Sequence, residues 1–247
     1  MFDYRLTYPA AVDDTATIDL QAMLANTDWS APFRLQRELL RALVDEIGAD
    51  VPIVETVYSP WMYLLRHVGR GFAACASHQS HDLAEVLSRL TEETRNHVRR
   101  VREMGCFGIY FATLAADRSL PTSAAERQHD VDVLEAGAGI VRMLHLHGRN
   151  LDATAVNHYP REVLHLESGG PDHPTLADLR ADSRCLMGGL SSSTLTTVSM
   201  SEMQRQLADA IAGAGPEGLI IAPGCIVSPS LSARKMKALL DPALLRV

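Results

Sequence analysis

The sequence predicts an α/β fold in which parallel strands are joined by crossover helices. Short apolar runs alternate with longer amphipathic segments six times along the 247 residues, and several of the amphipathic segments end in glycine, as helices tend to. Neither GxGxxG nor GxxxxGK(S/T) follows any of the apolar runs, so the sequence suggests no dinucleotide site and no P-loop. Together these observations favour a (β/α) barrel over an open doubly wound sheet.

Six apolar runs are the expected strands, because each is short and bounded by turn residues or helical segments. Their ranges are 51–59, 106–113, 141–148, 161–167, 184–191 and 218–225. A weaker strand is expected at 2–8, where apolar or aromatic residues alternate with polar ones. Seven strands leave an eight-stranded barrel one strand short. Its two open edges would then need a cover, from a partner or from another copy of the chain, unless the chain is truncated.

The segments between these runs are expected to be helices, because their apolar residues recur with a helical period. The clearest are 33–48, 81–105, 123–137 and 201–215. The arginines within 95–103 are expected on a solvated helix face. His129 and Asp130 are expected on a helix surface, and an acid–base pair is the open alternative.

Composition limits the class of protein. With 47% hydrophobic residues the chain can bury one large core, so a single domain over 1–247 is expected. The net charge is −7 and the basic residues are spread out, which argues against a nucleic-acid or anionic-membrane partner. Residues 1–14 lack the apolar run of a signal peptide, and no segment reaches the roughly 18 apolar residues of a membrane span. A soluble, cytoplasmic protein with reduced cysteines is expected.

Two histidines stand one residue apart in the segment RMLHLHG at 142–148. On a strand His145 and His147 point to one face, while Leu144 and Leu146 suit the helix side, so both imidazoles are expected in the lumen. They come last in their strand, at the end where barrels keep active sites. Cys225 ends another strand. Two imidazoles and a thiolate would give zinc three ligands and leave a fourth position open.

Ordinary explanations exist for each of these residues. An HxH pair at a strand end is often a hydrogen-bonded pair of histidines, and a buried cysteine is common. The serine-rich segment 188–194 lacks the last glycine of GxSxG, so a nucleophile elbow is not expected there. From spacing alone the metal site therefore stays one of two alternatives.

Five segments occur in an order that resembles the superfamily of uroporphyrinogen decarboxylases and cobamide-dependent methyltransferases. They are TVYSPW (56–61), GCFGIYFAT (105–113), LHLHG (144–148), LMGGL (186–190) and IIAPGCIVSP (220–229). The resemblance covers almost the whole chain, and it implies that these segments are the third, fourth, fifth, seventh and eighth strands of a (β/α)8 barrel. It also implies that 161–167 is the sixth strand and the segment at 2–8 the second, so that the first strand is missing.

The resemblance implies a metal site as well. Methyltransferase members of the superfamily bind zinc through HxC on the fifth strand and a cysteine on the eighth. His145 and Cys225 match by position, whereas His147 stands where the first cysteine would be. A neutral imidazole in that place leaves the centre with a formal charge of about +1 instead of 0, which would change how readily a bound thiol accepts a methyl group. Decarboxylase members carry a Gly-His-Gly type segment on the last strand, where this chain has Pro223, Gly224 and Cys225.

The expected function is a zinc-dependent methyltransferase that moves a methyl group from a corrinoid-type donor to a thiol. His145, His147 and Cys225 would hold zinc. Thr113, Ser191 and Arg149, at the ends of strands, are expected substrate contacts.

Two alternatives remain open. One is a cofactor-free decarboxylase of the uroporphyrinogen type, which would need cationic side chains for the substrate carboxylates; Arg149 is the obvious one near a strand end. The other is a non-catalytic family member that serves as a partner subunit. The expected partners are a small-molecule substrate, a corrinoid protein and, in an oligomer, a second copy of the chain.

Overall fold

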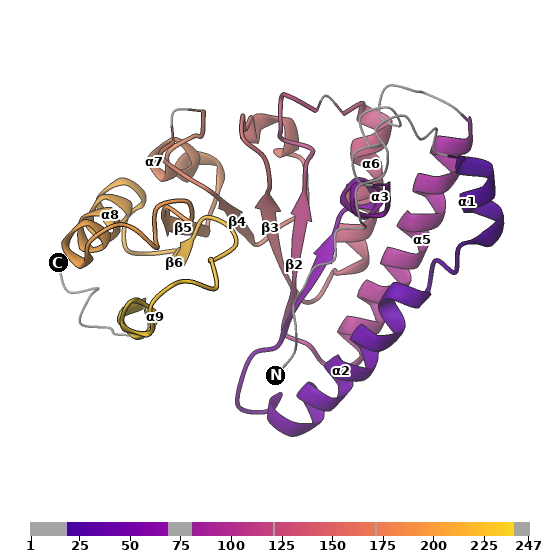
Figure 1. The fold of residues 1–247 in the computed structure, drawn as a ribbon, viewed down its shortest axis with the longest axis horizontal. Helices are drawn as coiled ribbons and strands as arrows, with labels where there is room; N and C mark the ends of the chain where they lie inside the picture. The colour runs from indigo at the N-terminus through magenta and orange to yellow at the C-terminus, as the bar shows by residue number, and fades with distance from the viewer. Residues whose placement is uncertain (1–18, 69–80, 121, 171, 240–247) are drawn as a thin grey trace. The chain divides into compact units, whose positions relative to one another are not determined.

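Helices and strands alternate along the chain in the computed structural model (Figure 1). The structure describes residues 19–68, 81–120, 122–170 and 172–239, so the strand expected at 2–8 lies outside the described residues. The chain divides into two compact units. Unit 1 is Met1–Thr113 with Ser123–Ile140, and unit 2 is Leu114–Thr122 with Val141–Val247.

Unit 1 consists of helices around a pair of parallel strands. Its described elements are α1 (Leu20–Asn26), α2 (Ala31–Ile47), β1 (Val54–Tyr58), α3 (Pro60–Val68), α5 (His81–Glu103), β2 (Gly108–Thr113) and α6 (Ala124–Ala136). β1 pairs with β2 in parallel, with Val57 opposite Phe111, and both side chains are fully buried. The apolar face of α5 supplies Val98 and Val101 to the same core.

Two polar pairs lie at the core of unit 1, one of them fully buried and the other partly buried. Nε2 of His97 on α5 lies 3.1 Å from Oε1 of Glu55 on β1, and the His97 ring stacks on Phe33. Oγ1 of Thr113 donates to Oδ2 of Asp130 over 2.5 Å. The expectation that Asp130 lies on a helix surface is therefore wrong. Its side chain lies on the face of α6 that reaches the end of β2, where a threonine hydroxyl binds it.

Unit 2 repeats the alternation of strand and helix. Its described elements are β3 (Val141–Leu146), η2 (Ala153–Val156), β4 (Val163–Leu166), α7 (Leu176–Leu179), η3 (Arg180–Asp182), β5 (Leu186–Leu190), α8 (Met200–Ala214), β6 (Leu219–Pro223) and α9 (Ala233–Leu239). β3, β4, β5 and β6 pair in that order, all in parallel. In the register of β3 and β4, His145 lies opposite His165. The carboxyl ends of these strands therefore meet at one edge of the sheet.

Each of the six expected strands contains an observed one, and the α/β prediction is confirmed. The clearest helices are also confirmed, for example Met200–Ala214 where 201–215 was expected; its N-terminus is capped by Ser199, whose Oγ accepts from the N–H of Glu202. The strand expected at 141–148 ends at Leu146, so His147 lies just beyond it. Among the described residues, no helix combines the length and apolar character that a membrane span requires.

Candidate metal centre

The first two candidate ligands, His145 and His147, lie at the carboxyl end of β3, with His147 just after the last strand residue. Leu144 and Leu146 are 0% and 1% exposed and fill the opposite face, as alternation along a strand requires. His145 is 4% exposed and buried with them, whereas His147 is half-buried just after the last strand residue. The apolar pattern of the strand thus directs both imidazoles to the same side.

β6 delivers the third candidate. Pro223 ends the strand, and the N–H of Gly224 donates to the carbonyl oxygen of Leu190 on β5 over 2.8 Å, which holds the chain beside β5 just before Cys225. Cys225 follows as a half-buried free thiol. Cys106 and Cys185 are also free, in line with the reduced cysteines expected, and Cys75 lies outside the described residues.

The three side chains meet at one point. Sγ of Cys225 lies 3.7 Å from Nε2 of His145 and 3.6 Å from Nδ1 of His147. One donor atom from each residue lies within 4.8 Å of the other two. No other group of three or more histidine, cysteine or carboxylate ligands of this kind occurs within the described ranges.

These distances fit a tetrahedral zinc ion. Bonds of about 2.05 Å to nitrogen and 2.3 Å to sulfur separate two ligand atoms by about 3.6 Å in a tetrahedron. The two sulfur-to-nitrogen distances, 3.7 and 3.6 Å, agree with this edge. Imidazole nitrogen and thiolate sulfur are also the donor types that zinc prefers. The residues present therefore fit the ion.

Burial keeps the two imidazoles neutral. Burial, together with the neighbouring His165 and His147, lowers the pKa of His145 to about 3, against a hydrogen bond with the backbone of His165 that raises it. Burial also lowers the pKa of His147, while the charge of Asp117 opposes that shift. A neutral imidazole keeps the lone pair that a metal needs.

The thiol responds in the opposite direction. Burial raises the pKa of Cys225, the charge of Glu167 raises it further, and a backbone hydrogen bond with Ile226 opposes both. Cys225 is therefore protonated at neutral pH when no cation is bound, and it must release a proton to act as a ligand.

A third histidine lies behind the first. The ring of His165 on β4 is 2% exposed and lies 4.7 Å from the ring of His145, and its Nε2 donates to the carbonyl oxygen of Pro223 over 2.9 Å. Burial lowers its pKa to about 4, against the hydrogen bond to Pro223. Sequence reasoning missed His165, although the alternation that singled out His145 and His147 also applies to LHLE at 164–167.

Asp117 fixes the backbone that follows His147. Its Oδ2 accepts from the N–H of Arg149 over 3.1 Å, and its Oδ1 accepts from both the N–H and the hydroxyl of Ser119. These hydrogen bonds hold the pKa of Asp117 below its usual value against the effect of burial. Gly148 packs so closely on this carboxylate that an added Cβ would lie 2.5 Å from Oδ2.

Glu167 plays the same part for the segment around Cys225. Its carboxylate accepts from the N–H and the hydroxyl of Ser192, at 3.1 and 2.5 Å for Oε2. An added Cβ on Gly224 would lie 2.5 Å from the same oxygen. The backbone beside Cys225 is therefore packed against a carboxylate that also holds the loop after β5.

The expected substrate contacts are in different surroundings. Thr113 belongs to unit 1, where it is buried and donates to Asp130. Ser191 follows β5 in unit 2; its N–H donates to Oε1 of Gln206 and its hydroxyl lies 3.0 Å from that of Ser193. Arg149 follows the histidines, and its side chain is exposed. Thr113 already has a protein partner, and all three substrate contacts stay predictions.

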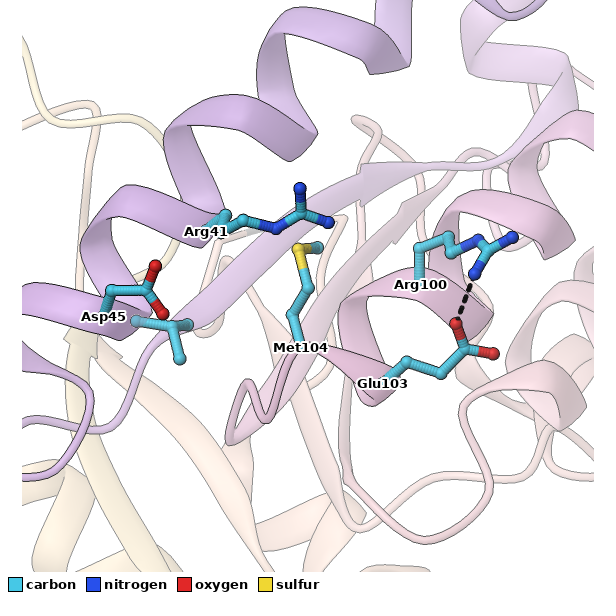
Figure 2. Close-up of a pocket in the computed structure, with 6 residues that line it drawn as sticks. Arg41, Asp45, Arg100, Glu103 and Met104 are labelled. Atoms are coloured by element: carbon cyan, nitrogen blue, oxygen red, sulfur yellow. Dashed lines mark hydrogen bonds and ion pairs between the residues drawn. The ribbon is translucent and has the colours of Figure 1, made fainter.

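A polar groove also lies in unit 1, between α2 and α5. Two overlapping hollows of about 240 and 260 Å³ are lined mainly by charged side chains, among them Arg41 and Arg100. Figure 2 shows Arg41 and Asp45 on one helix, Met104 between the helices, and Arg100 bound to Glu103. Charges of both signs line this groove, and its lining residues form no group of three metal ligands like the one in unit 2.

A family model described as Uroporphyrinogen decarboxylase (URO-D) matches residues 8–243. The chain belongs to the URO-D family. The match confirms the resemblance seen in the five segments, and the matched residues include parts of both units. No curated protein gives a significant match.

Solved structures similar to this URO-D family chain show the same fold. A "methyltransferase from Methanosarcina mazei" has a TM-score of 0.69 and 21% identity, over 85% of this chain and 63% of that one. A B12-independent methionine synthase from Shewanella sp. W3-18-1 in complex with selenomethionine has a TM-score of 0.57 and 14% identity, over 84% and 64%. A putative vitamin-B12 independent methionine synthase from Listeria monocytogenes has 0.55 and 14%, over 85% and 68%.

This URO-D family chain thus spans less than two thirds of the first two of these proteins. The shared architecture confirms the predicted fold of the barrel type.

Proposed function

We propose that this chain is a single URO-D-like domain that acts as a zinc-dependent methyltransferase, with a thiol as acceptor and a corrinoid-type compound as methyl donor. The observation that carries the proposal is the meeting of Nε2 of His145, Nδ1 of His147 and Sγ of Cys225 within 4.8 Å. Its fold is shared with a methyltransferase and two methionine synthases, which supports the reaction class.

The three ligands have separate tasks in this proposal. His145 is buried with its ring against that of His165, and it would offer Nε2 as a neutral donor. His147 offers Nδ1 from the strand end, where Asp117 holds the following backbone. Cys225 supplies the negative charge after it releases its proton.

Zinc held by these residues would supply a Lewis acid with one open position, where it would lower the pKa of a thiol substrate. Two neutral imidazoles and one thiolate leave more positive charge than one imidazole and two thiolates would. The chain would therefore bind an acceptor thiol as thiolate readily and would activate its sulfur less. Ser191 and Arg149 lie after β5 and β3 and are the proposed contacts for the remainder of the substrate.

Metal analysis of the purified protein tests the site first. We expect about one zinc per chain, lost in Cys225→Ser and kept in Cys185→Ser. Cys185 is the matched control, because it is also a half-buried free thiol of unit 2 and lies immediately before β5, outside the candidate centre. Less than about 0.2 zinc per chain, unchanged by Cys225→Ser, would remove the basis of the proposal.

Activity is the second measurement. Free methylcobalamin and 2-mercaptoethanol, mixed with zinc-loaded protein, should give the methyl thioether at a rate that falls at least about 100-fold in Cys225→Ser. Methyl transfer that survives removal of zinc with a chelator would contradict the proposed chemistry.

A decarboxylase is the second candidate, since the matching family model carries that description. Porphyrinogen carboxylates need cations, and Arg149 is the exposed cation that follows the histidines. Turnover of uroporphyrinogen by metal-free protein, lost in Arg149→Gln, would establish this activity instead. Lack of both activities in a zinc-loaded chain would favour the partner-subunit alternative.

A further inference from the structure

The imidazole of His165 contacts the ring of His145 and also the backbone just before Cys225. The centroid of its ring lies 4.7 Å from that of the His145 ring, with 31° between the two planes. Its Nε2 donates to the carbonyl oxygen of Pro223, two residues before Cys225. His165 itself lies on β4, which supplies none of the three candidate ligands.

The hydrogen bond to Pro223 reaches past a neighbouring strand. β4 pairs with β5, and β5 pairs with β6, so β5 separates His165 from the end of β6 in the sheet. The backbone ladder therefore does not connect β4 to β6. The side chain of His165 makes this connection, at the edge where Cys225 leaves the sheet.

Cys225 lies outside any helix or strand, so its position depends on the contacts of the segment just before it. β6 ends at Pro223, and the segment before Cys225 is held by the hydrogen bond from Gly224 to Leu190 and by the one from His165 to Pro223. The backbone bond ties Cys225 to β5, whereas the bond from His165 ties it to the ring that packs on His145. Of these two hydrogen bonds, only the one from His165 to Pro223 links the position of the Cys225 thiol to that of an imidazole ligand.

We propose that His165 is a positioning residue that sets the distance between His145 and Cys225 and thereby prepares the centre for a metal ion. This inference rests on the proposed function, because the distance between His145 and Cys225 matters only if both residues bind the proposed metal ion. His165 itself is not one of the three candidate ligands, and its Nε2 donates to the carbonyl oxygen of Pro223.

Two substitutions separate the parts of this role. His165→Phe keeps an aromatic ring against His145 and removes the N–H, whereas His165→Gln keeps a donor near the position of Nε2 and removes the ring. We expect His165→Phe to raise the Kd for zinc at least about 10-fold, and His165→Gln to bring it back to within about threefold of the wild-type value. His158→Phe is the control, because His158 is an exposed histidine of unit 2 that packs on Tyr159.

A measurement without metal completes the test. The rate at which iodoacetamide alkylates Cys225, followed on the Cys225 peptide by mass spectrometry, should rise severalfold in metal-free His165→Phe and stay near the wild-type rate in His165→Gln. Circular dichroism and thermal melting identify variants that do not fold. Should His165→Phe not fold, His165→Gln decides: a wild-type Kd and alkylation rate support the role of the donor, and a loss above about 10-fold overturns it.

The failure of this inference differs from failure of the proposed function. If the wild-type protein binds no zinc and His165→Phe still exposes the thiol, the proposed function fails and the positioning role stands. If the wild-type protein binds zinc and a folded His165→Phe matches it in Kd and alkylation rate, the positioning role is wrong. Equal loss in both variants would also overturn it, because a donor near the position of Nε2 would then not restore the centre.

Discussion

Sγ of Cys225 lies 3.6 Å from Nδ1 of His147, although 78 positions separate the two residues in the sequence. The contact exists because β3 and β6 run parallel in one sheet and end at the same edge. A thiol and an imidazole at this distance can be joined by a hydrogen bond or by a shared cation, and the two cases respond differently to pH.

Zinc binding should strengthen with pH by about one logarithmic unit of affinity per pH unit between about pH 7 and 8.5. The pKa of His145 is about 3 and that of His147 is lowered, so neither imidazole carries a proton to release in this range. The pKa of Cys225 is raised, so its thiol releases one proton for each ion bound. Chelator competition at several pH values measures the slope.

The same experiment on Cys225→Ser supplies the control, because the proton-releasing group is then missing and the slope should vanish together with most of the affinity. A slope near two in the wild-type protein would show that an imidazole also loses a proton, which would contradict the neutral state assigned to the histidines.

Gly148→Ala should destabilise unit 2 by about 2–4 kcal/mol. Gly148 has a φ of +149°, and the new Cβ would lie 2.5 Å from Oδ2 of Asp117. Gly139→Ala is the matched control, because Gly139 has a φ of +96° but nothing within 4 Å of an added Cβ, so it should cost only about 1 kcal/mol. Urea denaturation gives both values, and equal costs would show that Asp117 moves away easily.

Asp117→Asn should weaken zinc binding about 10-fold and cost about 1–3 kcal/mol of stability. The carboxylate accepts from Arg149 on one oxygen and from Ser119 on the other, so an amide group must point its NH₂ at one of these donors. Asp209→Asn, on an exposed position of α8, should stay within about 0.5 kcal/mol of wild type. Calorimetric zinc titrations and denaturation of both variants check the prediction, which fails if the two behave alike.

Glu162 should give unit 2 a small loss of stability in acid. Arg142 donates to both carboxylate oxygens at the start of β3 and β4, and this pairing lowers the pKa of Glu162. A lowered pKa in the folded state means that the stabilisation is present above the unfolded pKa and is lost as the pH falls through the folded one. Because the Glu162 side chain is 44% exposed, the amount should be below about 1 kcal/mol.

Glu162→Gln tests this directly, since the variant should show a flatter dependence of stability on pH between about pH 5 and 3 than the wild-type protein does. Glu217→Gln, at an exposed position before β6, leaves the pair intact and should keep the wild-type dependence. A wild-type slope in Glu162→Gln would assign the acid sensitivity to other groups.

Much of the architecture and three members of the centre could be predicted because they depend on local periodicity. Alternation of apolar runs with amphipathic segments predicts parallel strands and crossover helices, and the structure has both. A period of two in MLHLH places His145 and His147 on one face whatever the remainder of the chain does. The position of Cys225 at the end of an apolar run predicts its place at the same edge of the sheet.

The tertiary structure alone decided which other groups surround the centre. The reach of His165 past β5 to Pro223 depends on the order and register of three strands, and the contact of Asp117 with the backbone after His147 depends on where two separate segments meet. The burial of Thr113 against Asp130 likewise depends on the packing of α6 on β2. The reason is physical: the direction of a side chain on a strand is set by its immediate neighbours, whereas its partner is set by distances between segments that the chain brings together only when it folds.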